Sequence, residues 1–206
     1  MCARCLQSQN VDITIFERKK KVQMVSTTGI SLGNDGQQLF DKYVPFGNLR
    51  GKAVQHEECV NFSPGGEVQN HPLPKGGHGV ITSSWTRVRS LLEENLDAET
   101  CGCGANIRLG YGCQVTRMQE EEEKVRLTYL DQGNEKEEMF DLVIGADGAR
   151  SFVRHTFLCD CESKYSGYVA WRGEILEQHC SDQFERVRQG DLGFVPMPDS
   201  KSYILL

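Results

Sequence analysis

The fold of this chain is decided by one stretch, Asp141-Leu142-Val143-Ile144-Gly145-Ala146-Asp147-Gly148-Ala149-Arg150-Ser151-Phe152-Val153-Arg154. Its apolar run at 142–144 lies between a charged residue and a glycine turn, which predicts a strand buried on both faces. Two glycines then bracket the carboxylate of Asp147, and Ser151 is placed to cap a short helix. Ligands of open α/β sheets bind at the carboxyl ends of strands. We therefore expect Asp147 to accept hydrogen bonds from ligand hydroxyls, with Gly148 letting the ligand approach the backbone.

A second predicted strand, over 11–18, ends in an acidic residue. Its apolar side chains alternate and include several β-branched residues, which is typical of a half-buried strand. Residues 3–9 before it have the pattern of a helix tail. In dinucleotide-binding folds an acidic residue at the end of the second strand hydrogen-bonds the adenosine ribose. Glu17, followed by Arg18, is therefore a candidate for binding a ribose.

The stretch 141–154 resembles the Asp-Gly fingerprint of FAD-dependent aromatic-ring monooxygenases, the hydroxybenzoate-hydroxylase-like flavoproteins. Residues 165–173 resemble the strand that enters the substrate domain of these enzymes, and 28–34 resemble their G-I-x-L loop near the flavin ring. The fingerprint and the substrate-domain segment occur in the family's order and spacing. The sequences of these segments are most similar to the branch of dihydroxypyridine and hydroxynicotinate hydroxylases.

The resemblance implies an α/β fold: a partial FAD-binding Rossmann-like domain with a β-meander, plus part of a β-sheet substrate domain. It implies a discontinuous, incomplete FAD-binding domain over 1–160, with 45–80 contributing to the substrate side. The start of the substrate-binding sheet would occupy 161–206. The patterns themselves predict helices over 37–43 and 83–96, and strands over 53–62, 67–70, 107–117, 125–130, 139–144, 165–175, 191–196 and 202–206.

The resemblance also implies a reaction and its cofactors. Such enzymes use FAD, with NAD(P)H as reductant and dioxygen as co-substrate, to hydroxylate a small aromatic or N-heteroaromatic ring. The cofactor-binding residues carried over are Glu17, Arg18, Val115, Asp147 and Gly148, with the Val115 backbone amide at the adenine.

Three residues of the 165–173 segment are candidates for binding the substrate. Tyr168 and Trp171 offer flat faces to an aromatic acid, and Arg172 can pair with its carboxylate. The alternative is that all three are ordinary sheet and surface residues. No catalytic acid or base is assigned.

Two family motifs have no counterpart in the chain. The first strand with its G-x-G-x-x-G turn would precede Met1, and the second flavin motif would follow Leu206. We therefore expect a chain truncated at both ends. Without the glycine turn, the pyrophosphate lacks the backbone amides and helix N-terminus that hold it. The alternative function is thus a non-catalytic fragment that does not retain FAD.

Composition excludes several other classes of protein. Lys and Arg number 23 against 29 Asp and Glu, so the net charge of −6 gives no support for nucleic acid as a partner. No apolar run reaches the roughly 20 residues of a membrane span, and no signal segment opens the chain, so a cytoplasmic protein is expected.

The nine cysteines predict free thiols rather than a disulfide framework. A thiol-rich metal binder is the third and weakest hypothesis. It would combine Cys2 and Cys5 with the C-x-C pairs at 101–103 and 159–161, a spacing poorly suited to tetrahedral zinc. No metal site is therefore expected.

Overall fold

The structure is a computed structural model. It describes residues 1–6, 9, 11–24, 26, 28–44, 53–56, 58–63, 67–72, 79–94, 96, 106–158, 164–173, 175–182, 185–188, 192–197 and 203–205. The chain divides into two compact units. One unit consists of Met1–Val11, Ser26–Gly104 and Arg172–Leu206, and the other of Asp12–Val25 and Ala105–Trp171. The fold is mixed α/β in character, as the sequence predicts.

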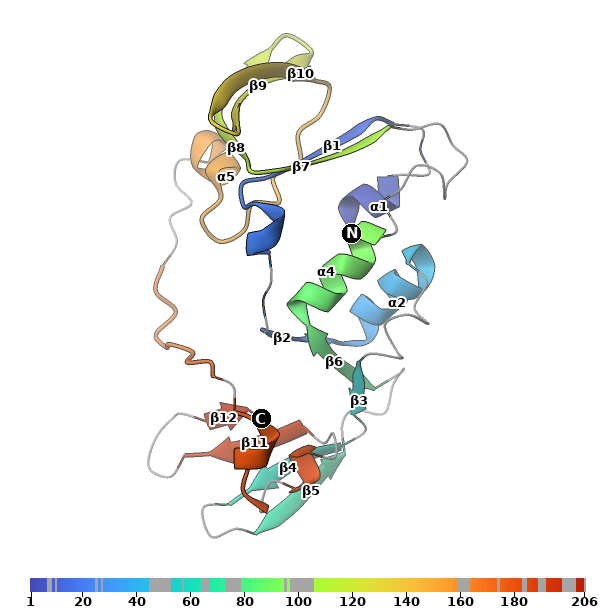
Figure 1. Ribbon diagram of the computed structural model, residues 1–206, viewed down its shortest axis with the longest axis vertical. Helices are drawn as coiled ribbons and strands as arrows, with labels where there is room; N and C mark the ends of the chain where they lie inside the picture. Colours follow the sequence, from blue (N-terminus) through green and yellow to red (C-terminus); the bar gives the residue numbers. More distant parts are fainter. Residues whose placement is uncertain are drawn as a thin grey trace. The chain divides into compact units, whose positions relative to one another are not determined.

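The unit of residues 12–25 and 105–171 begins with two parallel strands (Figure 1). Strand β1 (Ile13–Glu17) pairs with β7 (Ile107–Tyr111) in parallel register. A hydrogen bond links the residues that precede the two strands, since the backbone N–H of Asn106 donates to Asp12 Oδ1 at 2.9 Å. A short 3-10 helix, η2 (Lys21–Gln23), follows β1.

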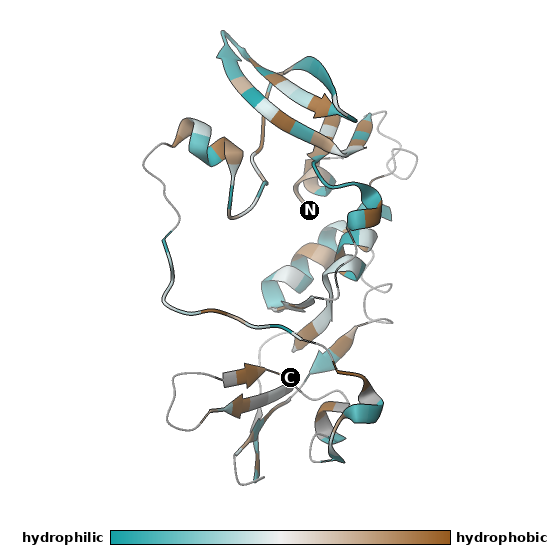
Figure 2. Ribbon diagram, turned by 60° about the vertical axis from the view of Figure 1, so that its left-hand side comes forward, coloured by the Kyte–Doolittle hydropathy of each residue, from teal (hydrophilic) through white to brown (hydrophobic). Residues whose placement is uncertain are grey.

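Three antiparallel strands follow β7 and form a β-meander, although not with the predicted bounds. They are β8 (Cys113–Glu121), β9 (Lys124–Asp131) and β10 (Asn134–Phe140), in the order β10-β9-β8. The run predicted as one strand over 107–117 is divided after Tyr111, and the last strand covers Asn134–Phe140 rather than 139–144. Glu122 (φ 52°) and Gly133 (φ 88°) take left-handed conformations in the two hairpin turns. Figure 2 shows hydrophilic and hydrophobic residues interspersed along the meander, and residues 134–138 of β10 are all hydrophilic.

An aromatic cluster joins β1 to the meander. The ring of Phe16 lies 4.7 Å from that of Tyr129 and 5.8 Å from that of Phe140, the second contact being edge to face. Arg108 on β7 pairs with Glu138 on β10, and the buried Tyr129 hydroxyl donates to the same carboxylate. The strand that carries Glu17 and the meander are thereby held as one packed body.

The prediction of a buried strand at 142–144 is wrong. Strand β10 ends at Phe140, and residues 141–148 form no helix or strand. Leu142 is 72% exposed and Ile144 is 52% exposed. A strand is held by hydrogen bonds to its neighbours, and no described strand pairs with this run. The apolar pattern alone therefore did not produce a strand.

The unit that contains the N-terminus has one sheet packed with helices. Strands β2 (Gly29–Leu32), β6 (Val80–Ser84) and β3 (Val54–His56) form an antiparallel sheet in the order β2-β6-β3. Helix α2 (Asn34–Tyr43) contains the helix predicted at 37–43 and begins before it. Helix α4 (Trp85–Glu94) lies within the helix predicted at 83–96. The core cluster comprises Phe40, Val44, Ile81, Val88 and Leu91.

Helix α1 (Cys2–Leu6) docks on this core. Met1 packs against the cluster, and Arg4 Nε donates to the carbonyl oxygen of Tyr43 at 2.5 Å. That carbonyl lies in the last turn of α2, where backbone acceptors have no partner within the helix.

A second sheet of this unit joins segments far apart in the sequence. Its strands are β5 (Val68–Pro72), β4 (Glu58–Phe62), β11 (Leu192–Pro196) and β12 (Tyr203–Leu205), in the order β12-β11-β4-β5 (Figure 1). Strands β4 and β11 pair in parallel, and the other two pairs are antiparallel. The 3-10 helix η4 (Glu177–His179) and helix α6 (Glu185–Arg188) precede β11.

The long strand predicted at 165–175 is also absent from the described residues. Residues 164–173 form no helix or strand, and Tyr165 is 75% exposed. Aromatic and β-branched residues favour strands mainly through packing against neighbouring strands, and this segment has no such partner among the described elements. Within the described part of the chain, no helix is long and apolar enough to span a membrane.

We expect Leu91→Ala to lower the free energy of unfolding by about 2–5 kcal/mol, because it removes a core side chain that is 1% exposed. Leu39→Ala on α2, where the side chain is 45% exposed, is the matched control and should change stability by less than about 0.5 kcal/mol. Urea denaturation of both variants measures the difference. Equal effects would contradict the assignment of the core.

Candidate functional site

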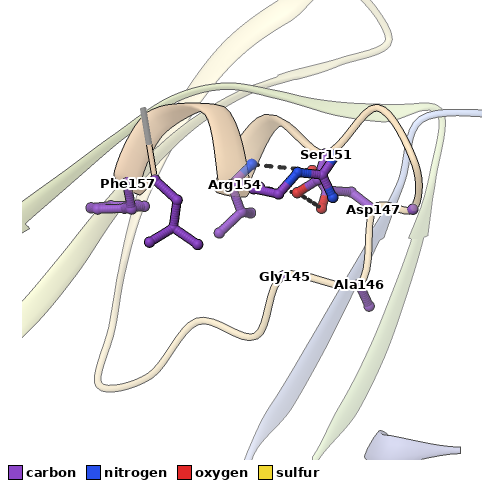
Figure 3. A pocket seen from close by; sticks show the side chains of 9 residues that line it. Gly145, Ala146, Asp147, Ser151, Arg154 and Phe157 are labelled. Atoms are coloured by element: carbon purple, nitrogen blue, oxygen red, sulfur yellow. Dashed lines mark hydrogen bonds between the residues drawn. The ribbon is translucent and has the colours of Figure 1, made fainter. Parts of the chain in front are cut away.

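A pocket lies where the chain leaves the meander and turns into helix α5 (Phe152–Phe157). Its volume is about 530 Å³, and Figure 3 shows the side chains that line it. The lining residues are Gly145, Ala146, Asp147, Gly148, Ser151, Val153, Arg154, Phe157 and Leu158. Asp147 and Gly148, which the sequence analysis assigned to the cofactor, both line this pocket, and their role there stays a prediction.

Two glycines shape this turn for different reasons. A Cβ added to Gly145 would lie 2.8 Å from Cβ of Val153, so the turn can pack against α5 only because residue 145 has no side chain. Gly148 has a φ of +79°, a left-handed conformation that residues with side chains rarely adopt. The turn therefore exposes bare backbone along one wall of the pocket.

The carboxylate of Asp147 is held by three hydrogen bonds from its own chain. The Ser151 hydroxyl donates to Oδ1 at 2.5 Å, and the backbone N–H groups of Phe152 and Val153 donate to Oδ2 at 2.5 and 3.2 Å. These two amides are among the first of α5, which have no acceptor within the helix. An ionised carboxylate offers about four lone-pair sites, so about one remains for a ligand.

Ser151 connects this carboxylate to the helix. The residue is 7% exposed, and its oxygen accepts a hydrogen bond from the backbone N–H of Arg154 at 2.9 Å. This confirms the predicted helix cap, with the hydroxyl donating to Asp147 at the same time (Figure 3). The guanidinium of Arg154 donates to the carbonyl oxygen of Ala149, which fixes it across the turn.

These contacts lower the pKa of Asp147. Partial desolvation of the carboxyl by itself raises its pKa, although the residue as a whole is exposed. The hydrogen bond from Ser151, followed by those from the backbone, stabilises the ionised form and outweighs the desolvation. The pocket therefore contains a carboxylate that is ionised at neutral pH and oriented by its own chain.

The other predicted cofactor-binding residues lie in the same compact unit but do not line this pocket. Glu17 ends β1, and its Oε1 accepts a hydrogen bond from the backbone N–H of Lys19 at 2.8 Å. Arg18 follows in an exposed bend. Val115 is half-buried in β8, beside a β-bulge between Val115 and Arg117. Their roles at a cofactor stay predictions.

The three predicted substrate residues are all exposed. Tyr168 is 71% exposed and Trp171 is 94% exposed, and Arg172 is also exposed. None of them lines the pocket at Asp147. Their role likewise stays a prediction.

Sequence reasoning did not assign several pocket residues. Val153, Arg154, Phe157 and Leu158 belong to α5 or follow it and form the wall opposite the turn. The spacing of Asp147 and Ser151 was visible in the sequence. The link between their side chains was not, because it depends on how tightly the turn closes.

Metal binding gains no support from the described part of the chain. There, no three His, Cys, Asp or Glu side chains lie close enough together to hold a metal ion. Cys2 and Cys5 are free thiols on α1. The two C-x-C pairs at 101–103 and 159–161 lie outside the described residues.

This chain is similar in sequence and in fold to several monooxygenases. The chain is 28% identical over 177 residues to aurachin C monooxygenase/isomerase of Stigmatella aurantiaca, covering 82% of this chain and 42% of that protein. It is 28% identical over 183 residues to 3-amino-4-hydroxybenzoate 2-monooxygenase of Streptomyces cremeus, covering 84% and 42%. The crystal structure of the flavin-dependent monooxygenase PieE with FAD and substrate superposes with a TM-score of 0.67 and 17% identity, over 96% of this chain and 36% of PieE.

The chain has part of the fold of FAD-dependent monooxygenases. The two curated relatives are themselves monooxygenases by name. The chain spans about two-fifths of the length of each, 42% in both cases. No family model matches the chain.

We expect Gly145→Ala to destabilise the turn by about 1–3 kcal/mol, because the new methyl group meets the stiff β-branched side chain of Val153. The double variant Gly145→Ala/Val153→Ala should recover most of this loss. Gly173→Ala is the control, since a Cβ there meets nothing within 4 Å. Urea denaturation and hydrogen exchange of the α5 amides measure the effect. Additive losses in the double variant would contradict the contact.

The lowered pKa of Asp147 predicts a pH-dependent contribution to stability. The folded-state pKa lies below the unfolded value of about 3.9, so the contribution is present above that value and disappears as the pH falls through the folded pKa. The stability difference between the native chain and Asp147→Asn should therefore shrink between about pH 7 and about pH 2. Urea denaturation across this range measures it. A constant difference would show that the carboxyl is not held as described.

Proposed function

We propose that this chain binds FAD and acts as a monooxygenase that hydroxylates a small aromatic or N-heteroaromatic ring, with NAD(P)H as reductant. The observation that carries the proposal is the oriented Asp147 carboxylate in a pocket walled by bare backbone. Support also comes from the shared fold with PieE, whose structure contains FAD and substrate. Because this chain spans only part of PieE and of the curated relatives, the activity of the whole proteins is itself part of the proposal.

The residues at the pocket fit the ribityl chain of a flavin. A ribityl chain presents hydroxyl donors, and the Asp147 carboxylate has about one acceptor site left after its three internal hydrogen bonds. The turn around Gly148 offers close approach to the backbone, which a flexible polyol can follow. We therefore assign Asp147 and Gly148 to the ribityl chain.

We assign the adenosine end of the cofactor to Glu17, Arg18 and Val115. Only one carboxylate oxygen of Glu17 is used by Lys19, so the other can accept a ribose hydroxyl. The strand pairing of β8 with β9 skips Thr116 beside Val115, which interrupts the regular ladder where we expect a backbone amide to meet the adenine. Arg18 is exposed and can reach a ligand at the end of β1.

When bound, FAD would supply the redox and dioxygen chemistry of the hydroxylation, with NAD(P)H as the reductant. The residues of this chain bind the flavin, orient it and exclude water. We propose that residues 1–160 form the FAD-binding domain. The sheet of β4, β5, β11 and β12 supports our proposal that 45–80 and 161–206 contribute to the substrate side.

For the substrate we propose a planar aromatic acid bound by Tyr168, Trp171 and Arg172. Within the family we propose the branch of dihydroxypyridine and hydroxynicotinate hydroxylases, because the sequence of residues 165–173 resembles that branch. We also propose that the protein is cytoplasmic, a location in which free thiols such as those of Cys2 and Cys5 persist.

The alternative is a protein of this fold that does not retain FAD. The exposure of Leu142 and Ile144 favours it, because apolar side chains before the turn are in contact with water rather than packed in a sheet. Flavin absorbance of the purified protein separates the two functions. A yellow protein with stoichiometric FAD supports the proposal, and a colourless protein that takes up no added FAD supports the alternative.

We expect Asp147→Ala and Glu17→Ala each to weaken FAD binding by roughly tenfold to hundredfold, the loss of a hydrogen bond to a charged group. Asp141→Ala is the control, because its side chain is 88% exposed and pairs only with Lys124 at the surface. Fluorescence titration with FAD measures all three variants. Unchanged affinity for Asp147→Ala would remove this residue from the flavin site.

A further inference from the structure

We propose that Ser151 is a positioning residue, whose hydroxyl holds the Asp147 carboxylate so that one acceptor lone pair stays directed at a polyol hydroxyl in the pocket. The inference rests on the proposed function, because that function supplies the polyol. Ser151 itself need not touch the ligand. It acts through Asp147.

The geometry gives Ser151 two tasks at once. Its oxygen accepts the backbone N–H of Arg154 at 2.9 Å, and its hydroxyl proton is donated to Asp147 Oδ1 at 2.5 Å. The first bond caps α5, and the second leaves the hydroxyl no other direction in which to point. Because Ser151 is 7% exposed, water competes poorly for either bond.

The two oxygens of Asp147 are therefore in different environments. Oδ2 accepts two backbone amides, those of Phe152 and Val153, and these bonds persist as long as the start of α5 is formed. Oδ1 accepts the hydroxyl of Ser151. Without that hydroxyl, Oδ1 would lose this fixed partner, and its remaining lone pair would be less well oriented.

The charge of the carboxylate depends on the same bond. Desolvation raises the pKa of Asp147, and the hydrogen bond from Ser151 is the largest of the contributions that lower it. Two cations lie on the same turn and helix. Arg150 is exposed, and the guanidinium of Arg154 lines the pocket and donates to the Ala149 carbonyl oxygen. Removing the Ser151 donor should thus raise the pKa of Asp147 even though both cations remain.

Three substitutions separate positioning from capping. Ser151→Thr keeps both the cap and the donor. Ser151→Gly keeps most of the cap stability, because Gly is well tolerated at this position, but it has no hydroxyl to donate to Asp147 and adds no charge. Ser151→Ala removes both. A residue that only capped the helix would lose function in the Ala variant and keep most of it in the Gly variant.

The experiment measures two quantities for the native chain and the three variants. One is the dissociation constant for FAD by fluorescence titration. The other is the pKa of the Asp147 carboxyl by NMR titration, which requires no flavin. Amide chemical shifts of α5 report whether the helix forms in each variant.

We expect Ser151→Ala and Ser151→Gly to raise the dissociation constant about tenfold or more and to raise the pKa of Asp147. Ser151→Thr should stay within about threefold of the native value. Native affinity in Ser151→Gly, or an unchanged Asp147 pKa in Ser151→Ala, would overturn the inference. If Ser151→Gly does not fold, the Ala and Thr variants decide through the Asp147 pKa.

Failure of the proposed function gives a different result. In that case the native chain takes up no FAD, yet the Asp147 titration still reports on Ser151. A pKa that rises in Ser151→Ala and not in Ser151→Thr supports the positioning of the carboxylate, and equal pKa values in all variants overturn it.

Discussion

The candidate site depends on one interaction, the hydrogen bonding of the Asp147 carboxylate to the start of α5. The helix has only six residues, Phe152–Phe157, and a helix this short has little stability of its own. Asp147 satisfies two of its first amides, and Ser151 satisfies a third. The pocket wall that α5 provides therefore exists because the turn before it carries an acidic residue and a hydroxyl at the right spacing.

Packing supports the same arrangement from the other side of the turn. Gly145 lets the backbone approach Val153 closely enough to close the loop between the meander and α5. The meander in turn is joined to β1 through the rings of Phe16, Tyr129 and Phe140. Backbone conformation, close packing and hydrogen bonding together determine where the Asp147 carboxylate lies. A change in any of them should therefore shift this carboxylate in the pocket.

Much of this architecture could be predicted from the sequence, where the signal is local. Alternation in β1 and the helix predicted over 83–96 each depend on residues within one element. The turn at Asp147 and the cap at Ser151 also follow from neighbouring residues. The strand at 142–144 did not, because a strand requires a partner that its own sequence does not specify. The same reason explains the missing strand at 165–175, and why the parallel pairing of β4 with β11 was not foreseen.

The three internal hydrogen bonds of Asp147 also bear on how fast a ligand could bind. A carboxylate that is already oriented and partly dehydrated has little rotational freedom left to lose when a hydroxyl arrives. Association at this turn would then require no rearrangement of the chain and would be limited mainly by diffusion and orientation. Differences in affinity among related ligands would consequently appear in how long each stays bound.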